Sequence, residues 1–329
     1  MQSAGPEMRR FTEPGDASCA MPGLCLRLVP LGNRPYAATL MSIRMEEATL
    51  HLFRSSPFLG LVKTDVDSLV LQLPLEDADS FVLNGMACQP PMVAAYGGGA
   101  KSLLANPKNN SHAAIILPSA LSGRLLEPPV RSKLLQPGTH TLLRVSPEAW
   151  ERVRRVVSAS EEAIAAIPGV FDAEPAQQSL RESLLQAARD LISGKEDTEV
   201  RAPRSSKARQ RIVMAADAYF WEHKDRPIYT EELCNVLAVS ASALADAFRV
   251  MFTVTPHRFL KLRRLSMVRA ALLSHEGTAP LVKSVALSHG FWHLGQFGAD
   301  YRATFGELPS ETLARAGRWA TPEAAAEAP

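Results

Sequence analysis

The sequence has few of the features that mark secreted, metal-binding or membrane proteins. Its four cysteines, Cys19, Cys25, Cys88 and Cys234, are scattered, and their spacing fits neither a zinc site nor a disulfide framework. No run approaches the roughly 18–20 apolar residues of a membrane span, and no apolar run follows the first arginines as in a secretory signal. We therefore expect reduced thiols in a cytoplasmic protein that has no membrane partner.

Motifs for catalysis and cofactor binding are also missing. Gly97-Gly98-Gly99 lacks the following Lys-Ser/Thr and helix of a phosphate-binding loop, so we interpret it as a turn. The chain has no Gly-x-Ser-x-Gly motif and no Cys/His arrangement of a nucleophilic enzyme. His51, His112 and His140 are isolated, whereas a metal site in a β-barrel needs clustered His and Glu. We expect no metal, no cofactor and no enzymatic activity.

Net charge is only +2, but it is unevenly distributed along the 329 residues. Residues 204–318 carry a net charge of +6, and the remainder carries −4. A basic C-terminal third beside a mildly acidic remainder indicates one nucleic-acid-binding domain and one domain with another role. The length is typical of two domains, and the 46% hydrophobic content is ample for packed cores.

The N-terminal half has the texture of strands. Short apolar or alternating runs are separated by turn sequences such as Asn84-Gly85 and Pro137-Gly138, and no long helical pattern interrupts them. Many short strands with frequent turns predict a β-sandwich or barrel. The predicted strands are 24–31, 37–43, 48–53, 59–62, 68–73, 80–83, 92–95, 113–117 and 139–145.

Two amphipathic helices are predicted after these strands. Ser146 is a candidate N-cap before Pro147, and the apolar spacing continues until Pro168-Gly169. A second helix is expected from about Pro175 to Ser193. The two helices either cap the β-rich domain or pair across a dimer, and the sequence leaves both alternatives open.

Residues 281–306 predict a helix, a tight turn and a second helix. Gly290 is placed to close the first helix with a positive φ, which glycine adopts without steric cost. A row of aromatic residues, four apart, would anchor the second helix in the core: Phe297, Tyr301 and Phe305. Trp292 is also expected in the core. The other face of the second helix is left exposed, as reading a major groove requires.

A similar unit lies about 50 residues earlier. Thr230 is a plausible N-cap, and Leu233, Val236 and Leu237 are expected to face the core. Ala238-Val239-Ser240 forms the predicted turn, with Ser240 capping a helix anchored by Leu244 and Phe248. A long helix then starts at Thr255-Pro256 and continues to Ser274.

Residues 211–315 resemble the C-terminal double helix-turn-helix domain of the AraC/XylS family of bacterial transcription regulators. The matching positions are Leu233, Ala238, Ser240, Leu244, Phe248, Pro256, Arg263, 270–273, Gly290, Phe291, Phe297, Tyr301, Phe305, Gly306, Pro309 and Ser310. Thr253 departs from the pattern, because the family usually has Gly there. The resemblance implies two recognition helices in successive major-groove turns, about 34 Å apart. It also implies an N-terminal sensing or dimerising domain, often a cupin-like barrel.

The two predicted recognition helices differ in their equipment for reading bases. Candidate base-reading residues are Ser240, Ser242, Ala245 and Asp246 in the first unit, and His293, Leu294, Gly295, Gln296 and Ala299 in the second. Gln pairs well with adenine, whereas Ala offers at most a methyl contact and Asp is repelled by phosphates. Candidate DNA-backbone residues are Arg249, Arg258, Arg263, Arg264, Lys283 and Arg302.

The sequence thus predicts an α+β protein, with a β-rich barrel or sandwich and helices before an all-α domain containing two helix-turn-helix units. The expected segments are a disordered N-terminus (1–22), a sensing or dimerisation domain (23–193), a linker (194–208), a DNA-binding domain (209–317) and a disordered tail (318–329). The resemblance implies an activator with promoter DNA, RNA polymerase, a small-molecule effector and a second copy as partners. The alternatives are an effector-independent regulator, controlled by a protein partner or by abundance, and an enzyme fused to the same DNA-binding module.

Overall fold

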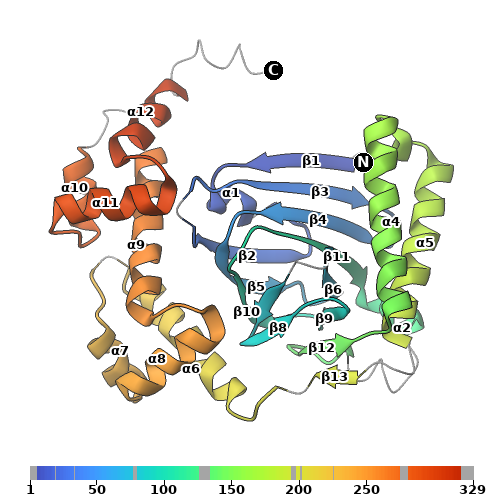
Figure 1. Cartoon of the computed structure of the whole chain (residues 1–329), viewed down its shortest axis with the longest axis horizontal. Coiled ribbons are helices and arrows are strands. Elements are labelled where there is room, and N and C mark those ends of the chain that lie inside the picture. Colours follow the sequence, from blue (N-terminus) through green and yellow to red (C-terminus); the bar gives the residue numbers. More distant parts are fainter. Residues whose placement is uncertain are drawn as a thin grey trace. The chain divides into compact units, whose positions relative to one another are not determined.

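The structure is a computed structural model that describes residues 6–18, 20–32, 34–76, 80–125, 134–193, 198–200, 202–224, 226–274 and 281–319. The chain forms two compact units (Figure 1). One comprises Met1–Leu28 and Ala37–Arg204, and the other comprises Val29–Tyr36 and Ser205–Pro329. The N-terminal unit is rich in strands and the C-terminal unit is helical, so the predicted fold class is confirmed.

Two antiparallel sheets make up the described strands of the N-terminal unit. The larger has the order β1-β3-β4-β11-β6-β9-β12-β13, and the smaller has the order β2-β5-β10-β7-β8. The strands of the larger sheet are β1 (Pro6–Phe11), β3 (Ala38–Arg44), β4 (Thr49–Ser55), β11 (Asn110–Pro118), β6 (Ser68–Pro74), β9 (Met92–Tyr96), β12 (His140–Arg144) and β13 (Thr198–Val200). The strands of the smaller sheet are β2 (Leu24–Pro30), β5 (Phe58–Thr64), β10 (Lys101–Asn106), β7 (Phe81–Leu83) and β8 (Met86–Cys88).

Both faces of the larger sheet are covered. Because side chains alternate along a strand, Leu50 and Leu52 of β4 point to one face and His51 and Phe53 to the other. The first pair packs in the hydrophobic core with the helices. The second pair faces an internal space that strands of the smaller sheet also line, through residues such as Phe58. The two sheets therefore form a sandwich with helices on its outer side.

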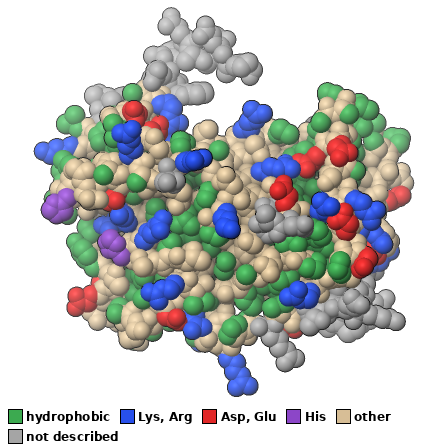
Figure 2. Space-filling view, viewed as in Figure 1, with side chains coloured by type: hydrophobic (Ala, Val, Ile, Leu, Met, Phe, Trp, Pro, Cys, Tyr) green, Lys and Arg blue, Asp and Glu red, His purple; other side chains and the backbone are tan. Residues whose placement is uncertain are grey.

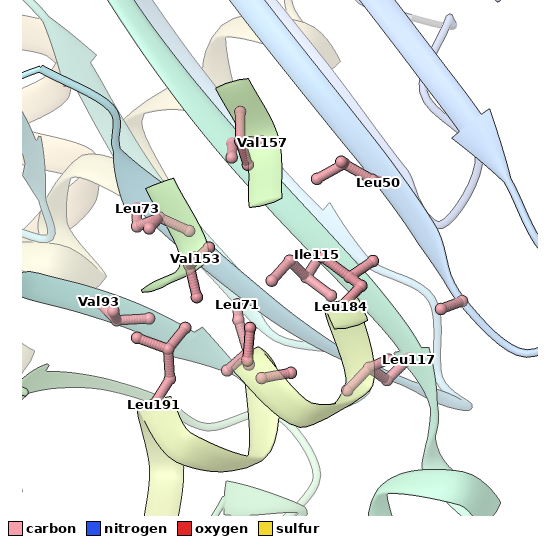
Figure 3. Packing of buried hydrophobic residues seen from close by; sticks show 14 of the residues in the cluster. Leu50, Leu71, Leu73, Val93, Ile115, Leu117, Val153, Val157, Leu184 and Leu191 are labelled. Carbon is pink, nitrogen blue, oxygen red and sulfur yellow. The ribbon is translucent and has the colours of Figure 1, made fainter. Parts of the chain in front are cut away.

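The helices α4 (Pro147–Ala166) and α5 (Glu174–Ser193) cover that outer side (Figure 3). Ser146 caps α4 as predicted, because its Oγ accepts a hydrogen bond from the Ala149 N–H at 3.1 Å. Side chains of both helices share one core with Leu71, Val93 and Ile115 of the sheet. These helices thus cap the sandwich, which was one of the two alternatives that the sequence left open.

Some elements of this unit escape the sequence analysis. The strand β10 pairs with both β5 and β7, yet five of its six residues are buried, so it shows no alternation. Strand β11 begins at Asn110, three residues before the predicted strand 113–117. Strand β8 and three short helical segments were also not predicted: α1 (Pro14–Ser18), α2 (Ser119–Leu125) and the 3-10 segment Val170–Asp172.

Two segments expected to lack structure belong to the larger sheet. Residues 1–22 were expected to be disordered, but β1 pairs with β3 from Pro6–Ile43 to Phe11–Ala38. The expected linker 194–208 contains β13, which pairs with β12, and the first residues of the next helix. Sheet edges present unpaired N–H and C=O groups that capture strands without an apolar pattern. The described part of the expected tail, 318–319, ends a helix, and 320–329 lie outside the described residues.

The C-terminal unit consists of helices that pack around a long central one (Figure 1). Its described helices are α6 (Ser206–Glu222), α7 (Thr230–Leu237), α8 (Ala241–Phe252), α9 (Pro256–Leu273), α10 (Val282–Ser288), α11 (Leu294–Phe305) and α12 (Pro309–Trp319). No single helix in the described ranges is long and apolar enough to cross a membrane; only α7 and α8 together, bent by 101°, meet that test.

Candidate nucleic-acid interface

The first helix-turn-helix is formed by α7 and α8. Tyr229 occupies the N-cap position of α7, so Thr230, the predicted cap, is instead the first helical residue. Ala238 ends α7 with a left-handed φ of 51°. Ser240 then caps α8 as predicted, because its Oγ accepts a hydrogen bond from the Ala243 N–H at 3.1 Å. The turn therefore follows the predicted pattern.

The apolar anchors of this unit are largely those that the spacing predicts. Leu233 of α7 and Leu244 and Phe248 of α8 are fully buried. Val236, expected to face the core, is 52% exposed. A helix of eight residues makes only a narrow contact with its neighbours, so the row through Leu233 suffices to hold it.

One side of α8 remains open. Ser242 and Arg249 are exposed and Ala245 and Asp246 are half-buried, and all four fall on one side because a helix has 3.6 residues per turn. Asp246 is ion-paired, since its Oδ2 accepts a hydrogen bond from Nε of Arg209 on α6 at 2.6 Å. The carboxylate is thus not the free anion that the sequence analysis expected to repel phosphate.

The second helix-turn-helix, α10 and α11, depends on Gly290. This residue has a φ of +80°, as predicted, and a Cβ there would lie 2.6 Å from Cγ of Pro227 and 3.4 Å from Nη1 of Arg264. Glycine is therefore required both by the backbone conformation and by the close approach. Pro227 precedes α7 and Arg264 belongs to α9, so Gly290 lies at the joint between the two helix-turn-helix motifs.

The core face of α11 is the predicted aromatic row. Phe297, Tyr301 and Phe305 are buried in one cluster with Leu265 and Val268 of α9. The ring centroids of Phe297 and Tyr301 are 5.7 Å apart, and those of Tyr301 and Phe305 are 4.6 Å apart. This packing fixes the rotation of α11 about its axis and therefore which residues it exposes.

The opposite face of α11 is exposed over two turns. Gly295, Gln296, Ala299 and Arg302 lie on it, and His293 is exposed at the N-cap position. Gln296 forms no hydrogen bond with the described residues. Its amide can therefore both donate to and accept from an external partner. The structure brings these predicted residues together on one surface.

Two residues beside this face differ from their expected roles. Leu294, a candidate base-reading residue, is half-buried and packs against the core cluster of α9 and α11. Trp292, expected in the core, is 68% exposed. The turn packs Phe291 against the core cluster and leaves its neighbour Trp292 outside.

Arg263, a candidate backbone contact, is buried and cannot reach a phosphate in this structure. Its Nη2 lies 2.8 Å from Oδ1 of Asp217 on α6, and the two side chains are 5% and 0% exposed. Its guanidinium also lies 5.2 Å from the ring centroid of Phe259. The residue fastens α9 to α6, and we correct its predicted role accordingly.

Arg264, another such candidate, is half-buried. Its guanidinium lies over the ring of Phe291, 5.5 Å from the centroid. Burial lowers the pKa of Arg264, while the nearby Tyr229 opposes this effect. Since Arg264 also adjoins Gly290, it ties the second turn to α9 and to the segment before α7.

Four of the predicted backbone candidates are exposed cations on different helices. They are Arg249 of α8, Arg258 of α9, Lys283 of α10 and Arg302 of α11. Figure 2 shows Lys and Arg side chains scattered over the visible face of the protein, with no single large basic patch. This pattern agrees with the modest +6 charge of the C-terminal third. Such scattered cations suit single contacts with separate DNA phosphates.

Two further residues of the first unit matter here. Arg209 of α6 adjoins the open side of α8 through Asp246, and no local pattern could have indicated this because the two are 37 positions apart. Thr253 ends α8 with a φ of 62°, a conformation that is strained for a β-branched residue. The glycine that the family usually has at this position adopts such a φ without steric cost.

Candidate metal ligands and thiols are dispersed over the described residues. They contain no group of three or more His, Cys, Asp or Glu side chains that could hold a metal ion. Cys25, Cys88 and Cys234 are free thiols, and Cys19 lies outside the described residues. His51 and His112, distant in sequence, line the same internal space of the sandwich.

Comparisons with known proteins identify a family domain within the C-terminal unit. A family model described as a helix-turn-helix domain matches residues 233–315. The XylDLEGF operon transcriptional activator 1 of Pseudomonas putida is 37% identical over 115 residues, which cover 35% of this chain and 34% of that protein. Activator 2 of the same operon is 39% identical over 104 residues, which cover 32% of this chain and 64% of that protein.

One solved structure shows a similar level of identity. A probable AraC family transcriptional regulator from Rhodopseudomonas palustris is 37% identical, with 32% of this chain and 97% of that chain covered and a TM-score of 0.31. The chain spans about a third to two thirds of the length of the two curated relatives named above. The range that the family model matches, 233–315, contains most of the two helix-turn-helix motifs and the helix between them.

Proposed function

Because the chain belongs to the AraC/XylS family through its C-terminal helix-turn-helix domain, we propose that it is a sequence-specific DNA-binding regulator that activates transcription. The observation that supports this most is the pair of open helix faces, on α8 and α11. Each follows a tight turn, and α9 joins the two motifs (Figure 1). Such an arrangement suits two successive major-groove turns of promoter DNA.

The second helix-turn-helix supplies the base-reading face in this proposal. Gln296 can form two hydrogen bonds with adenine N6 and N7, and His293 can bond to a base edge beside it. Gly295 lets the helix backbone approach the DNA, since nothing lies within 4 Å of the position where a Cβ would be. Ala299 completes the face with a methyl group that can contact thymine.

The first helix-turn-helix contributes less to base reading. The hydroxyl of Ser240 is occupied in capping α8, Ser242 is small, and Ala245 offers only a methyl contact. Arg249, Arg258, Lys283 and Arg302 donate to phosphates from both units. Phosphate contacts of this kind supply affinity and salt dependence but no sequence choice.

The proposal is tested by selecting DNA from a random-sequence library with the full chain. The selected duplexes should share two half-sites about 10 base pairs apart, in keeping with one helical turn of DNA. A transcription reporter with that site upstream should be switched on by the wild-type chain. Recovery of unrelated sequences, or of no duplex at all, would contradict the proposal.

We further propose that the N-terminal unit binds a small-molecule effector. A cleft of about 530 Å³ opens at one end of the sandwich, a size typical of ligand sites. Thr49 and Ile116 line it, and by strand alternation they lie on the same sheet face as His51 and Ala114, which line the internal space deeper in the sandwich. The cleft thus leads toward the interior of the domain.

A ligand screen by thermal shift on the full chain tests this second proposal. Val66 lines the cleft and is 72% exposed, so Val66→Trp should obstruct binding without affecting the core. Met8→Trp is the matched control, because Met8 is 61% exposed on β1 and does not line the cleft. Ligands whose shift survives Val66→Trp would place the site elsewhere. A reporter that responds to no ligand would favour the effector-independent alternative.

Assembly completes the proposed mechanism. An activator has to contact RNA polymerase when it is bound at the promoter, and we propose that the chain binds DNA as a homodimer. Light scattering of the full chain, alone and with the selected duplex, measures the number of copies per site. One copy per duplex at concentrations that switch on the reporter would contradict the dimer.

A further inference from the structure

Helix α6 brings a cation to the open side of the first recognition helix. Arg209 lies in the first turn of α6, and its Nε donates to Oδ2 of Asp246 on α8 at 2.6 Å. Its Nη1 donates to Oγ of Ser205, at the N-cap position of the same helix. The two side chains of the pair are 27% and 47% exposed, so the pair lies at the surface.

The two hydrogen bonds hold the guanidinium in one orientation. Arginine presents its donors in a planar fork, and Nε and Nη1 are the atoms engaged here. Among the described residues no acceptor is bonded to Nη2. The Nη2 N–H groups are therefore available to an acceptor outside the protein. A fork that is already oriented loses little entropy when it binds one.

The charges on this side of α8 point to the same kind of partner. Asp246 without its partner would repel DNA, whereas the Arg209–Asp246 pair is neutral overall and still carries unsatisfied donors. Arg249, exposed on the same side, adds a second cation. Because Arg209 comes from α6, it approaches from the edge of the α8 face, where DNA backbone and not base edges would lie.

We infer that Arg209 donates from Nη2 to a DNA phosphate beside α8, and that Asp246 is a positioning residue that orients the guanidinium for this contact. The inference rests on the proposed function and deepens it. It also explains an aspartate on a helix that faces DNA: its role is to hold an arginine. The first helix-turn-helix then contributes to affinity and to the register of the protein on the DNA, through a contact made from α6 and not from the recognition helix α8.

The test measures binding of the full chain to a duplex selected from the random-sequence library, over a series of salt concentrations. Arg209→Gln should raise Kd about tenfold at low salt and reduce the slope of log K against log[salt] by about 0.9, the value for one phosphate contact. Arg211→Gln is the matched control. Arg211 is an exposed arginine of the same helix, but it lies about 200° around the helix axis from Arg209, so the slope of this variant should stay that of wild type.

The positioning role is tested in the same titrations. Asp246→Asn keeps the cation, so the slope should stay within error of wild type while Kd rises by less than in Arg209→Gln. The double variant Arg209→Gln/Asp246→Asn should bind more tightly than Arg209→Gln alone, because it no longer leaves an unpaired carboxylate facing phosphate. Strictly additive effects would overturn the positioning role of Asp246.

A purely structural ion pair gives a different result. In that case Arg209→Gln lowers the thermal midpoint of the free protein and leaves the salt slope unchanged, and this outcome would overturn the inference. The proposed function is checked separately by Gln296→Ala, which does not involve this pair. If wild type binds the duplex and Gln296→Ala weakens binding while Arg209→Gln has a wild-type slope, only the present inference fails.

Discussion

The two recognition helices share a scaffold but expose different chemistry. On α8, the only carboxylate of the open side is ion-paired to Arg209, and its neighbours Ser242 and Ala245 are small. On α11, Gln296 is exposed without a hydrogen bond to the described residues, and His293 is exposed beside it. Similar anchoring in the core therefore permits one unit to specialise in phosphate contact and the other in base reading.

The two helix-turn-helix motifs also differ in their buried ion pairs. Helix α9 has one buried arginine beside each motif. Arg263 and Asp217 form a sealed pair, 5% and 0% exposed. Arg269 lies 2.9 Å from Glu307, which is 25% exposed and is also 2.8 Å from Arg315. The first helix-turn-helix thus packs beside a fully buried ion pair, and the second beside a carboxylate that is shared by two arginines and more solvated.

The largest effect is expected from breaking the sealed pair. Arg263→Ala should reduce the free energy of unfolding of the C-terminal unit by about 3–5 kcal/mol, because it leaves the Asp217 carboxylate buried without its cation. Denaturant titration, followed by circular dichroism of the full chain, measures this. Arg269→Ala should cost clearly less, since Arg315 still pairs with Glu307. Equal losses would show that the two buried pairs are equivalent.

Substitution of Gly290, at the joint between the two helix-turn-helix motifs, should have the next largest effect on stability. Gly290→Ala should destabilise the C-terminal unit by at least about 1–2 kcal/mol from the positive φ alone. The approach of 2.6 Å to Pro227 adds to this and should weaken DNA binding as well. Gly295→Ala is the matched control for stability, because nothing lies within 4 Å of its Cβ position. An unchanged midpoint of thermal unfolding in Gly290→Ala would mean that the two helix-turn-helix motifs pack independently.

The division of base reading is tested by equivalent truncations on the two helices. Gln296→Ala should cost about 1–3 kcal/mol of binding free energy and relax preference at one base pair, because it removes a bidentate contact. Ser242→Ala should cost less than about 0.5 kcal/mol, as surface substitutions away from specific contacts do. Binding to a panel of single-base variants of the selected duplex measures both. A larger loss from Ser242→Ala would reverse the roles of the two units.

The smallest effect concerns the end of α8. Thr253→Gly should stabilise the protein by about 1 kcal/mol, because glycine removes the strain of a β-branched residue at φ 62°. Ala238→Gly is the control: Ala238 has a φ of 51°, but its side chain is not β-branched, so the gain should be smaller. Thermal unfolding of the two variants compares them. Destabilisation by Thr253→Gly would indicate that the hydroxyl, which donates to the Phe252 carbonyl, outweighs the strain.

Local patterns predicted most of the C-terminal unit. The cap Ser240, the start of α9 at Thr255-Pro256, the positive φ of Gly290 and the aromatic row of α11 all followed from spacing and residue type. These features are set within one helix or one turn, so a single stretch of sequence contains the information. The exposure of Gln296 followed from the same periodicity.

Partnerships between distant segments were not predictable in this way. Periodicity indicates that Arg263 lies on a helix, but only the packing of α6 against α9 reveals Asp217 beside it. The same holds for Arg209 and Asp246, and for Arg264 stacked on Phe291. Trp292 and Leu294 were misplaced because the rotation across a tight turn depends on which neighbour the core accepts.

By itself, the sequence determined the succession of a strand-rich domain and a helical one, the two turns and the core anchors of each recognition helix. Its turn residues, caps and apolar periods act over a few positions, and local sterics and hydrogen bonding are enough to set them. The tertiary structure alone decided that β1 and β13 join the sheet, and which arginines are buried in ion pairs. It also assigned the carboxylate of α8 to Arg209. Those outcomes depend on contacts between residues that are 27 or more positions apart, which no local pattern encodes.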